Sequence, residues 1–186
     1  IRNCYAGQKY YDSLLQLYAS WGVDYIKVDD ICATGCHPHR RYSRKHEVEM
    51  LHKAIEKCGR DIILSLSPGP AAVEESWHYS RYANMWRITD DFWDDWKALL
   101  DMFDRCEKWQ NHVSCGCYPD CDMLPLGKVG KHFTAERDCL FTKEEQKTMM
   151  SLWCIFGSPL MLGAEMTQMD EWTVSLLTNE KLLNLL

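Results

Sequence analysis

Short apolar runs alternate with segments of helical spacing along the 186 residues of this chain. Apolar residues that recur every three or four positions predict amphipathic helices, whereas short apolar runs closed by turn-forming residues predict buried strands. Strands that alternate with helices form a parallel sheet with right-handed crossovers. The pattern predicts helices over residues 7–21, 43–58, 71–82, 91–109, 142–156 and 171–186, and strands over residues 23–28, 61–66, 84–88, 112–115 and 160–162.

Two helix boundaries carry specific local signals. Gly59 directly follows the predicted helix 43–58 and is expected to end it. Thr142 and Glu145 have the spacing of a capping box, in which the threonine caps the helix and the glutamate reaches back to it. We therefore expect a helix to begin directly after Thr142.

Polar residues follow nearly every predicted strand: Asp29-Asp30, Ser67, Asp90-Asp91 and residues 120–122. No glycine-rich phosphate loop follows a strand, which argues against a nucleotide-binding sheet. Polar strand ends are typical of the top face of a (β/α)8 TIM barrel, where each strand contributes site residues. Because a barrel takes about 250 residues and eight strands, we expect an α/β chain that is the second part of a barrel, with residues 1–186 as one partial domain.

Two of these strand ends carry carboxylates that suit one particular chemistry. Lys27 precedes Asp29 by two positions, and Arg87 precedes Asp91 by four. Glycosidic-bond cleavage requires two carboxyl groups delivered from different strand ends to one face of a sheet. We therefore predict part of a sugar-cleaving enzyme that needs no cofactor and no metal.

Composition excludes several other classes. The apolar fraction of 46% fits a folded globular domain, and the net charge of −6 is spread without long like-charge blocks, which disfavours a nucleic-acid partner. No apolar run approaches the ~20 residues that span a bilayer, so no membrane association is predicted. The chain opens on Ile1 without a signal peptide, and a native amino terminus could lie upstream.

Ten cysteines leave the redox compartment open. Cys58, Cys106 and Cys154 fall within helical patterns and are expected to be small core residues. The run Cys32, Cys36, His37 and His39 has zinc-ligand types, but its spacing is not a known pairing and no second half is evident. Other cysteines fall in predicted loops, where pairing is conceivable: Cys4, Cys115, Cys117, Cys121 and Cys139.

With these motifs in view, the chain resembles glycoside hydrolase family 27, the α-galactosidase family. The resemblance covers nearly the whole chain and implies the strand 4 to strand 8 portion of that family's barrel. Four motifs carry it, in the family's order: residues 21–29 resemble its fourth strand, Trp86-Arg87 with Asp91 its sixth, residues 118–124 its seventh and residues 157–161 its eighth.

The resemblance implies a role for each matching residue. Asp29 would be the catalytic nucleophile and Asp91 the general acid/base, while Lys27 and Arg87 would hydrogen-bond the sugar's hydroxyls. Met123 would pack beside the sugar. Ser67 opens the segment that contacts the sugar's 2-substituent. Cys4 and Cys32 lie near the positions of a cysteine pair that flanks the nucleophile strand in animal members of the family, and the resemblance therefore implies a disulfide between them.

Some family features differ or are absent. Tyr118 stands where the family usually has Trp, and the first two strands and the C-terminal β-sandwich are missing. The small segment 67–71 matches neither animal specificity pattern. The expectation is an α-galactosidase acting on small or oligosaccharide galactosides, with α-N-acetylgalactosaminidase and β-L-arabinopyranosidase as alternatives, or a catalytically silent truncated barrel. Compartment and oligomeric state stay open, with a secreted, periplasmic or lysosome-like location slightly favoured.

The proposed chemistry needs Asp29 ionised and Asp91 protonated. Lys27, on the same strand face, could hold Asp29 ionised. Asp91 lies at the start of the predicted helix 91–109, whose positive end favours the charged form, so the negative charge of Asp29 or an apolar surround from Phe92 and Trp93 would have to keep it neutral. Other polar and aromatic residues nearby are expected to have structural roles. Asp90 would cap a helix N-terminus, and Asp120 and Asp122 would order their loop. The helix would contribute core residues at Trp93, Trp96 and Trp109.

Overall fold

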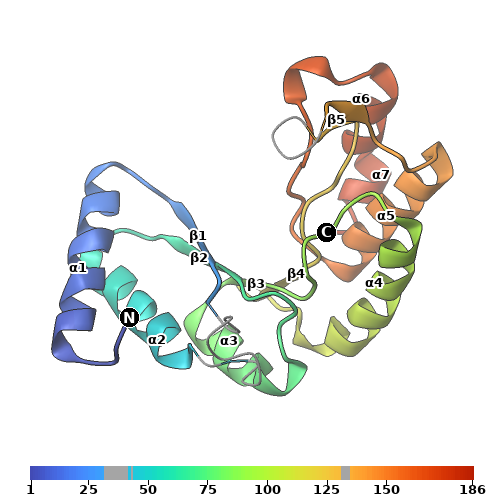
Figure 1. Cartoon of the computed structure of the whole chain (residues 1–186). Coiled ribbons are helices and arrows are strands. Elements are labelled where there is room, and N and C mark those ends of the chain that lie inside the picture. The colour runs from blue at the N-terminus through green and yellow to red at the C-terminus, as the bar shows by residue number, and fades with distance from the viewer. Residues whose placement is uncertain (32–41, 43, 131–134) are drawn as a thin grey trace. The chain divides into compact units, whose positions relative to one another are not determined.

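The structure is a computed structural model that describes residues 1–31, 42, 44–130 and 135–186. The chain divides into two compact units. The sheet unit comprises Ile1–Ile88 and Ser114–Pro119, and the second unit comprises Thr89–Val113 and Asp120–Leu186. Figure 1 labels the elements of both units. That residues 1–186 form a single domain stays a prediction.

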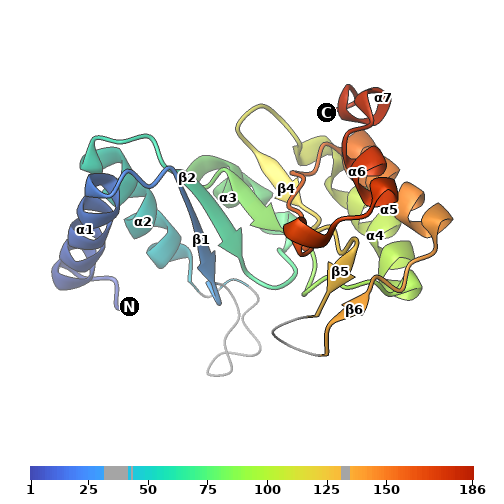
Figure 2. The same ribbon diagram turned by 90° about the horizontal axis from the view of Figure 1, so that it is seen from above.

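The sheet unit confirms the predicted parallel α/β arrangement. Its strands follow the order β1-β2-β3-β4, in which β1 and β2 pair in parallel, as do β2 and β3 (Figure 2). The elements run in the order α1 (Tyr5–Ser20), β1 (Tyr25–Asp29), α2 (Lys45–Cys58), β2 (Ile63–Ser67), the 3-10 turn η1 (Val73–Glu75), α3 (Ser76–Tyr82), β3 (Met85–Arg87) and β4 (Tyr118–Asp120).

The two faces of this sheet differ in composition. Leu64, Leu66 and Trp86 point to one face and are buried, and the Trp86 indole stacks on Tyr79 of α3 with ring centroids 5.6 Å apart. Lys27, on the neighbouring strand β1, is directed to the opposite face, because successive side chains alternate across a strand. The helices therefore cover the apolar face and leave the polar face for a site.

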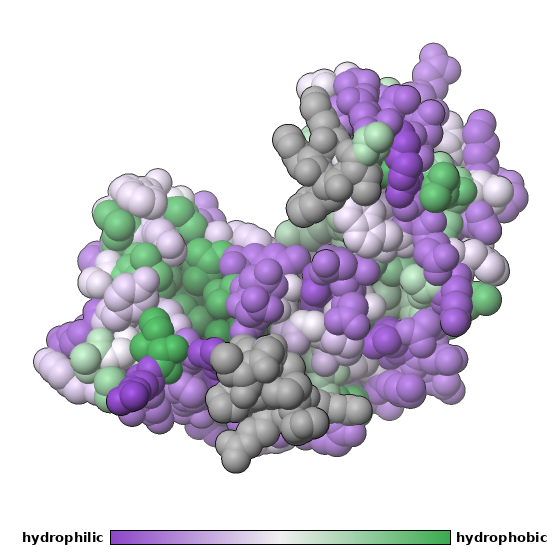
Figure 3. Space-filling model, in the orientation of Figure 1, coloured by the Kyte–Doolittle hydropathy of each residue, from purple (hydrophilic) through white to green (hydrophobic). Residues whose placement is uncertain are grey.

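Apolar side chains are also exposed on the sheet unit. Figure 3 shows hydrophobic surface over α1 and alongside β1 and β2. Leu17, Trp21 and Ile63 are exposed by 45, 65 and 44%. The strand β1 ends the sheet, and its outer edge pairs with no strand among the described residues. The sheet unit thus presents apolar surface beside its end strand.

The second unit combines helices with a short hairpin. Its core contains Phe92, Leu99 and Trp153, and the rings of Phe92 and Trp153 lie 5.0 Å apart. The helix α4 packs against α5. The elements are α4 (Trp96–Trp109), η2 (Gln110–His112), β5 (Lys128–Val129), β6 (Arg137–Asp138), α5 (Lys143–Phe156), η3 (Met166–Gln168), α6 (Glu171–Leu177) and α7 (Glu180–Leu183).

Both predicted boundary signals are confirmed. Gly59 follows α2 in the left-handed conformation, with φ of 77°, which glycine adopts without steric cost. The Thr142 hydroxyl accepts a hydrogen bond from the Glu145 N–H, and the Glu145 carboxylate accepts one from the Thr142 N–H at 2.7 Å. The capping box therefore starts α5 where the sequence predicted.

Three predicted helices differ from the structure, and the one predicted over residues 91–109 begins only at Trp96. In place of the helix 71–82, the turn η1 precedes α3, which begins at Ser76. The helix 171–186 is split into α6 and α7, because Asn179 accepts hydrogen bonds from the Lys181 and Leu182 N–H groups and caps a new helix. Among the described residues, no helix is long and apolar enough to cross a bilayer.

Two strand predictions were wrong in position or extent. Residues 112–115 form the end of η2 and a bridge between Ser114 and Cys117, and the strand lies at β4 instead. Residues 160–162 form only one parallel bridge, between Leu162 and Leu124. The hairpin of β5 and β6 was not predicted, because its polar residues show no apolar alternation.

Candidate active site

The strand register places four of the predicted site residues on one face of the sheet. Lys27 pairs with Ser65, and Asp29 pairs with Ser67 on the adjacent strand β2. Ser65 in turn pairs with Met85, so Arg87, two residues further on, shares the face of Ser67. Adjacent strands lie about 4.8 Å apart, so the structure brings Lys27, Asp29, Ser67 and Arg87 together at the carboxyl ends of three neighbouring strands.

The carboxylate of Asp29 stands at the end of its strand because the chain turns there. Asp30 adopts a left-handed conformation with φ of 50°, which aspartate tolerates better than most residues. Ile31 then turns inward and is buried. Asp29 is therefore the last residue of β1, and in the described residues it is exposed.

The loop after β2 closes over the end of β3. Gly69 has a φ of 66°, and the Ala71 N–H donates a hydrogen bond to the Arg87 carbonyl at 3.1 Å. Ser67 and Arg87 are both buried, at 3 and 8% exposure. The small residues after β2 are thus tied to the carboxyl end of β3.

Sequence reasoning missed Ser65 on this face. Its hydroxyl oxygen is buried and has no hydrogen-bond partner among the described residues. A buried polar group without a partner is unfavourable, and a water or a ligand hydroxyl would relieve it. Alternation with Ser67 along the strand was the available signal.

Asp91 belongs to the second unit, on the exposed part of a loop formed by residues 89–95. The next residue, Phe92, is buried, and its N–H donates to the Asp122 carboxylate at 2.8 Å. The Asp122 N–H in turn donates to the Asp120 carboxylate at 2.8 Å. Asp120 and Asp122 order this region as predicted, and they fix the backbone next to Asp91.

The expected position of Asp90 and Asp91 at a helix N-terminus was wrong. The helix α4 begins at Trp96, and Asp95 caps it by accepting a hydrogen bond from the Ala98 N–H at 2.9 Å. Because the helix dipole acts within the first turn, it does not bear on Asp91. No apolar surround is therefore needed at Asp91 to oppose a helix dipole.

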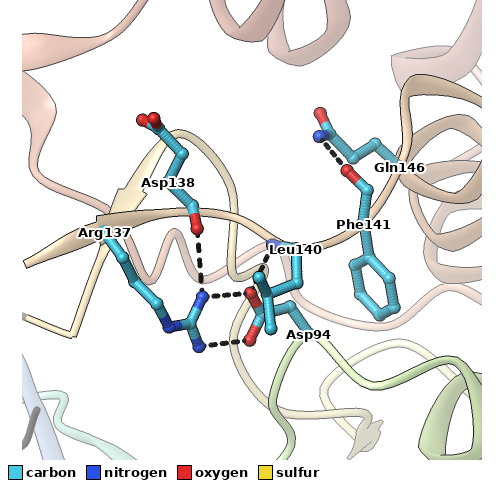
Figure 4. A network of polar contacts seen from close by, with 6 residues as sticks. All are labelled: Asp94, Arg137, Asp138, Leu140, Phe141 and Gln146. Atoms are coloured by element: carbon cyan, nitrogen blue, oxygen red, sulfur yellow. Dashed lines mark hydrogen bonds and ion pairs between the residues drawn. The ribbon is translucent and has the colours of Figure 1, made fainter.

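A buried ion pair follows Asp91 on the same loop, and the sequence did not reveal it (Figure 4). The Asp94 carboxylate accepts two hydrogen bonds from the Arg137 guanidinium, at 2.5 and 2.8 Å, and one from the Leu140 N–H at 2.6 Å. Burial by itself would raise the pKa of Asp94, but Arg137 and the Leu140 N–H outweigh it and lower that pKa below its usual value. The loop is thereby tied to β6.

Met123 lines a cavity of about 360 Å³ in the second unit. Trp93 lines the same cavity, so its interpretation as a core residue of a helix was wrong, because it precedes α4 and is only half-buried. Trp96 is 42% exposed and is not a core residue either, whereas Trp109 is buried as predicted.

The buried cysteines are partly as predicted. Cys106 and Cys154 are buried and Cys58 is half-buried, while Cys121, expected in a loop, is fully buried with its sulfur 3.7 Å from that of Cys106. Burial raises the pKa of the Cys121 thiol well above its usual value.

The zinc and disulfide expectations involve residues that the structure does not describe. The residues Cys32, Cys36, His37 and His39 lie outside the described ranges, and so does the Cys32 end of the expected disulfide to Cys4. Within the ranges that are described, no group of three or more His, Cys, Asp or Glu residues could hold a metal ion.

A parallel sheet with basic and acidic residues at the carboxyl ends of its strands is typical of TIM-barrel proteins, and comparison with known proteins supports this fold class. A family model described as "Alpha galactosidase A" matches residues 3–185. The chain belongs to this α-galactosidase family, glycoside hydrolase family 27.

Individual relatives agree with this membership. Alpha-galactosidase 2 of Arabidopsis thaliana is 32% identical over 89% of this chain. A solved family 27 β-L-arabinopyranosidase from Geobacillus stearothermophilus is 53% identical, with a TM-score of 0.90 over 96% of this chain and 41% of that one. A putative α-N-acetylgalactosaminidase from Bacillus halodurans is 49% identical, with a TM-score of 0.76 over 96% of this chain and 40% of that one.

The matches cover only part of each relative. The chain spans 38% of the length of the Arabidopsis enzyme and about the same share of the solved structures. The described fold is accordingly a partial barrel of the family, as the sequence predicted.

Proposed function

We propose that the complete gene product containing this chain is a retaining glycosidase that removes a terminal pyranosyl residue. The observation that carries the proposal is the register at the end of β1, which sets Asp29 beside Ser67 with Lys27 on the same face. In a family 27 chain, this is where an attacking carboxylate is needed. Lys27 supplies a positive charge on the same sheet face as Asp29.

The reaction follows from the two carboxyl groups. Asp29 attacks the anomeric carbon while Asp91 gives its proton to the leaving oxygen, so the glycosidic bond breaks and a glycosyl ester forms on Asp29. Asp91 then takes a proton from water, whose oxygen attacks the same carbon and releases Asp29. The two displacements retain the configuration. This chemistry requires carboxyl groups about 5–5.5 Å apart in the working enzyme.

The neighbouring side chains are suited to holding the sugar. Arg87 and Lys27 are donors on the face that carries Asp29, and they would hydrogen-bond ring hydroxyls. Ser67 and the small residues of the loop after it would adjoin the 2-substituent. Met123 would pack against the apolar side of the ring.

For the terminal sugar, we propose β-L-arabinopyranose in preference to α-D-galactose. The supporting observation is that the solved β-L-arabinopyranosidase is 53% identical to this chain, whereas the Arabidopsis α-galactosidase is 32% identical. The two sugars share the configuration of their ring hydroxyls, and the arabinose lacks only the C6 hydroxymethyl group. The same nucleophile and acid serve both, so α-galactosidase activity is the second candidate.

The test uses the complete gene product and three nitrophenyl glycosides: β-L-arabinopyranoside, α-D-galactoside and N-acetyl-α-D-galactosaminide. We expect the first to give the highest kcat/KM. Asp29→Asn should lower kcat at least 10³-fold, and Asp90→Asn, which removes a charge from an exposed neighbour of Asp91, should leave kcat unchanged. A normal rate in Asp29→Asn would overturn the assignment of the nucleophile. No turnover of any glycoside would favour a silent barrel instead.

A further inference from the structure

The cavity beside Met123 has walls from three separate segments of the second unit. Trp93 comes from the loop 89–95, Lys128 and Glu136 come from the region of the β5–β6 hairpin, and Gly163 and Glu165 come from the segment after α5. The volume of about 360 Å³ lies within the range of small-molecule sites, about 300–1,000 Å³. It is large enough for a sugar ring.

Polar contacts hold these walls together. The bidentate pair of Asp94 and Arg137 ties the loop that carries Trp93 to β6. The Glu165 N–H donates to the Lys128 carbonyl at 2.9 Å, which ties the third segment to β5. The cavity is therefore framed by specific hydrogen bonds on both sides of the hairpin.

The backbone at residue 163 is matched to the Met123 side chain. The Gly163 N–H donates to the Leu124 carbonyl at 2.9 Å. A Cβ atom at position 163 would lie 2.4 Å from the Met123 sulfur. The absence of a side chain at residue 163 therefore lets the Met123 side chain pack directly against the backbone there.

The lining has the chemistry that carbohydrate sites use. A half-buried indole and a thioether offer apolar surface for the C–H face of a sugar ring. The Lys128 ammonium, which has three donors and pairs with Asp138 at 2.7 Å, and the carboxylates, of which that of Glu165 also accepts from Thr167, can hydrogen-bond its hydroxyls. Ligand sites commonly combine such apolar walls with a few polar groups. We therefore expect a saccharide rather than a purely apolar ligand.

The position of Trp93 indicates which part of the substrate the cavity takes. Trp93 follows Asp91 by two residues on one loop, and the general acid must reach the oxygen of the leaving group. Met123, the residue expected beside the cleaved sugar, forms another wall. We propose that this cavity is the subsite for the leaving-group saccharide and that Trp93 is its platform. This inference rests on the proposed function.

The test compares two substrates of the complete gene product that share the terminal sugar preferred by the wild type. One is a disaccharide and the other is the glycosyl fluoride, whose leaving group is too small to fill the cavity. Trp93→Ala should lower kcat/KM for the disaccharide about tenfold more than for the fluoride, a difference of about 1.4 kcal/mol. Trp93→Phe, which keeps an aromatic face, should recover most of that loss.

The matched control is Trp96→Ala, which removes an exposed indole three residues further along and outside the cavity lining. It should leave kcat/KM for both substrates unchanged. An equal loss on both substrates in Trp93→Ala, or no loss on either, would overturn the subsite while leaving the glycosidase proposal intact. A wild type that hydrolyses neither substrate would overturn the proposed function and the subsite together.

Discussion

The carboxylate of Asp94 and the guanidinium of Arg137 form a bidentate ion pair, although the two residues are 43 positions apart in the sequence. The Asp94 side chain is only 2% exposed, and the Arg137 side chain is 33% exposed. The pair joins the loop that carries Asp91 and Trp93 to the β5–β6 hairpin. The geometry of the proposed acid and of the leaving-group cavity therefore depends on one contact outside both.

Removing the cation of this pair should destabilise the protein. Arg137→Ala leaves the Asp94 carboxylate buried without its cation, still accepting a hydrogen bond from the Leu140 N–H, and we expect a loss of about 2–3 kcal/mol in the free energy of unfolding. Arg137→Lys keeps the positive charge but loses the bidentate geometry of the guanidinium, so its free energy of unfolding should lie between those of the wild type and Arg137→Ala. Denaturant unfolding measures both, and a loss below 0.5 kcal/mol in Arg137→Ala would show that the pair is a weak surface contact.

The same pair predicts how stability responds to acid. The pKa of Asp94 is lowered in the folded state, so its contribution is complete above the unfolded value near 3.9 and is lost as pH falls through the folded pKa. We expect the wild type to lose more stability than Asp94→Asn between about pH 4 and pH 2. If the free energies of unfolding of the two proteins fell equally over this pH range, Asp94 would not be the group responsible.

Gly163 should not tolerate even a methyl group. Its φ is not in the left-handed region, so Gly163→Ala strains no backbone angle, yet the new Cβ would lie 2.4 Å from the Met123 sulfur and 2.9 Å from its Cγ. We expect a loss of about 1–3 kcal/mol from overpacking. A double-mutant cycle with Met123→Ala checks the cause, because removing the long side chain should recover part of the loss. If the stability losses of the two single variants simply added in the double variant, the Met123 side chain would not be the cause of the overpacking.

Two buried serines should respond in opposite ways to alanine. Ser158 is fully buried and its hydroxyl accepts a hydrogen bond from the Cys121 N–H at 3.0 Å, so Ser158→Ala leaves a buried donor unpaired at a cost of about 1–3 kcal/mol. The Ser65 hydroxyl has no partner among the described residues, so Ser65→Ala should be neutral or stabilising. Thermal unfolding of both variants measures these changes in stability. A destabilised Ser65→Ala would contradict the expectation and indicate a bound water at that hydroxyl.

The local sequence predicted those features whose causes lie within a few residues. Gly59 and the Thr142–Glu145 capping box end and begin helices through contacts within one turn. Asp29 was correctly placed at a strand end, because an apolar run followed by aspartates marks where burial stops. The same logic predicted a parallel sheet, since strands and helices alternate along the chain.

The start of α4 shows where local reasoning fails. Asp90, Asp91, Asp94 and Asp95 can each cap a helix, and the sequence does not rank them. In the structure, Arg137 and the Leu140 N–H engage Asp94, so Asp95 becomes the cap and Asp91 stays in the loop. The deciding partner lies more than forty residues away, beyond the range of any local pattern.

The sequence by itself therefore determined the alternation of helices and strands from α1 to β3, the end of α2, the start of α5 and the strand positions of Lys27, Asp29 and Arg87. These follow from backbone propensity and hydrophobic periodicity, which act over a few residues. Tertiary structure alone decided the pairing of Asp94 with Arg137, the burial of Cys121 and the cavity beside Met123. Those features arise where distant segments meet, and their free energy depends on which buried polar group finds a partner.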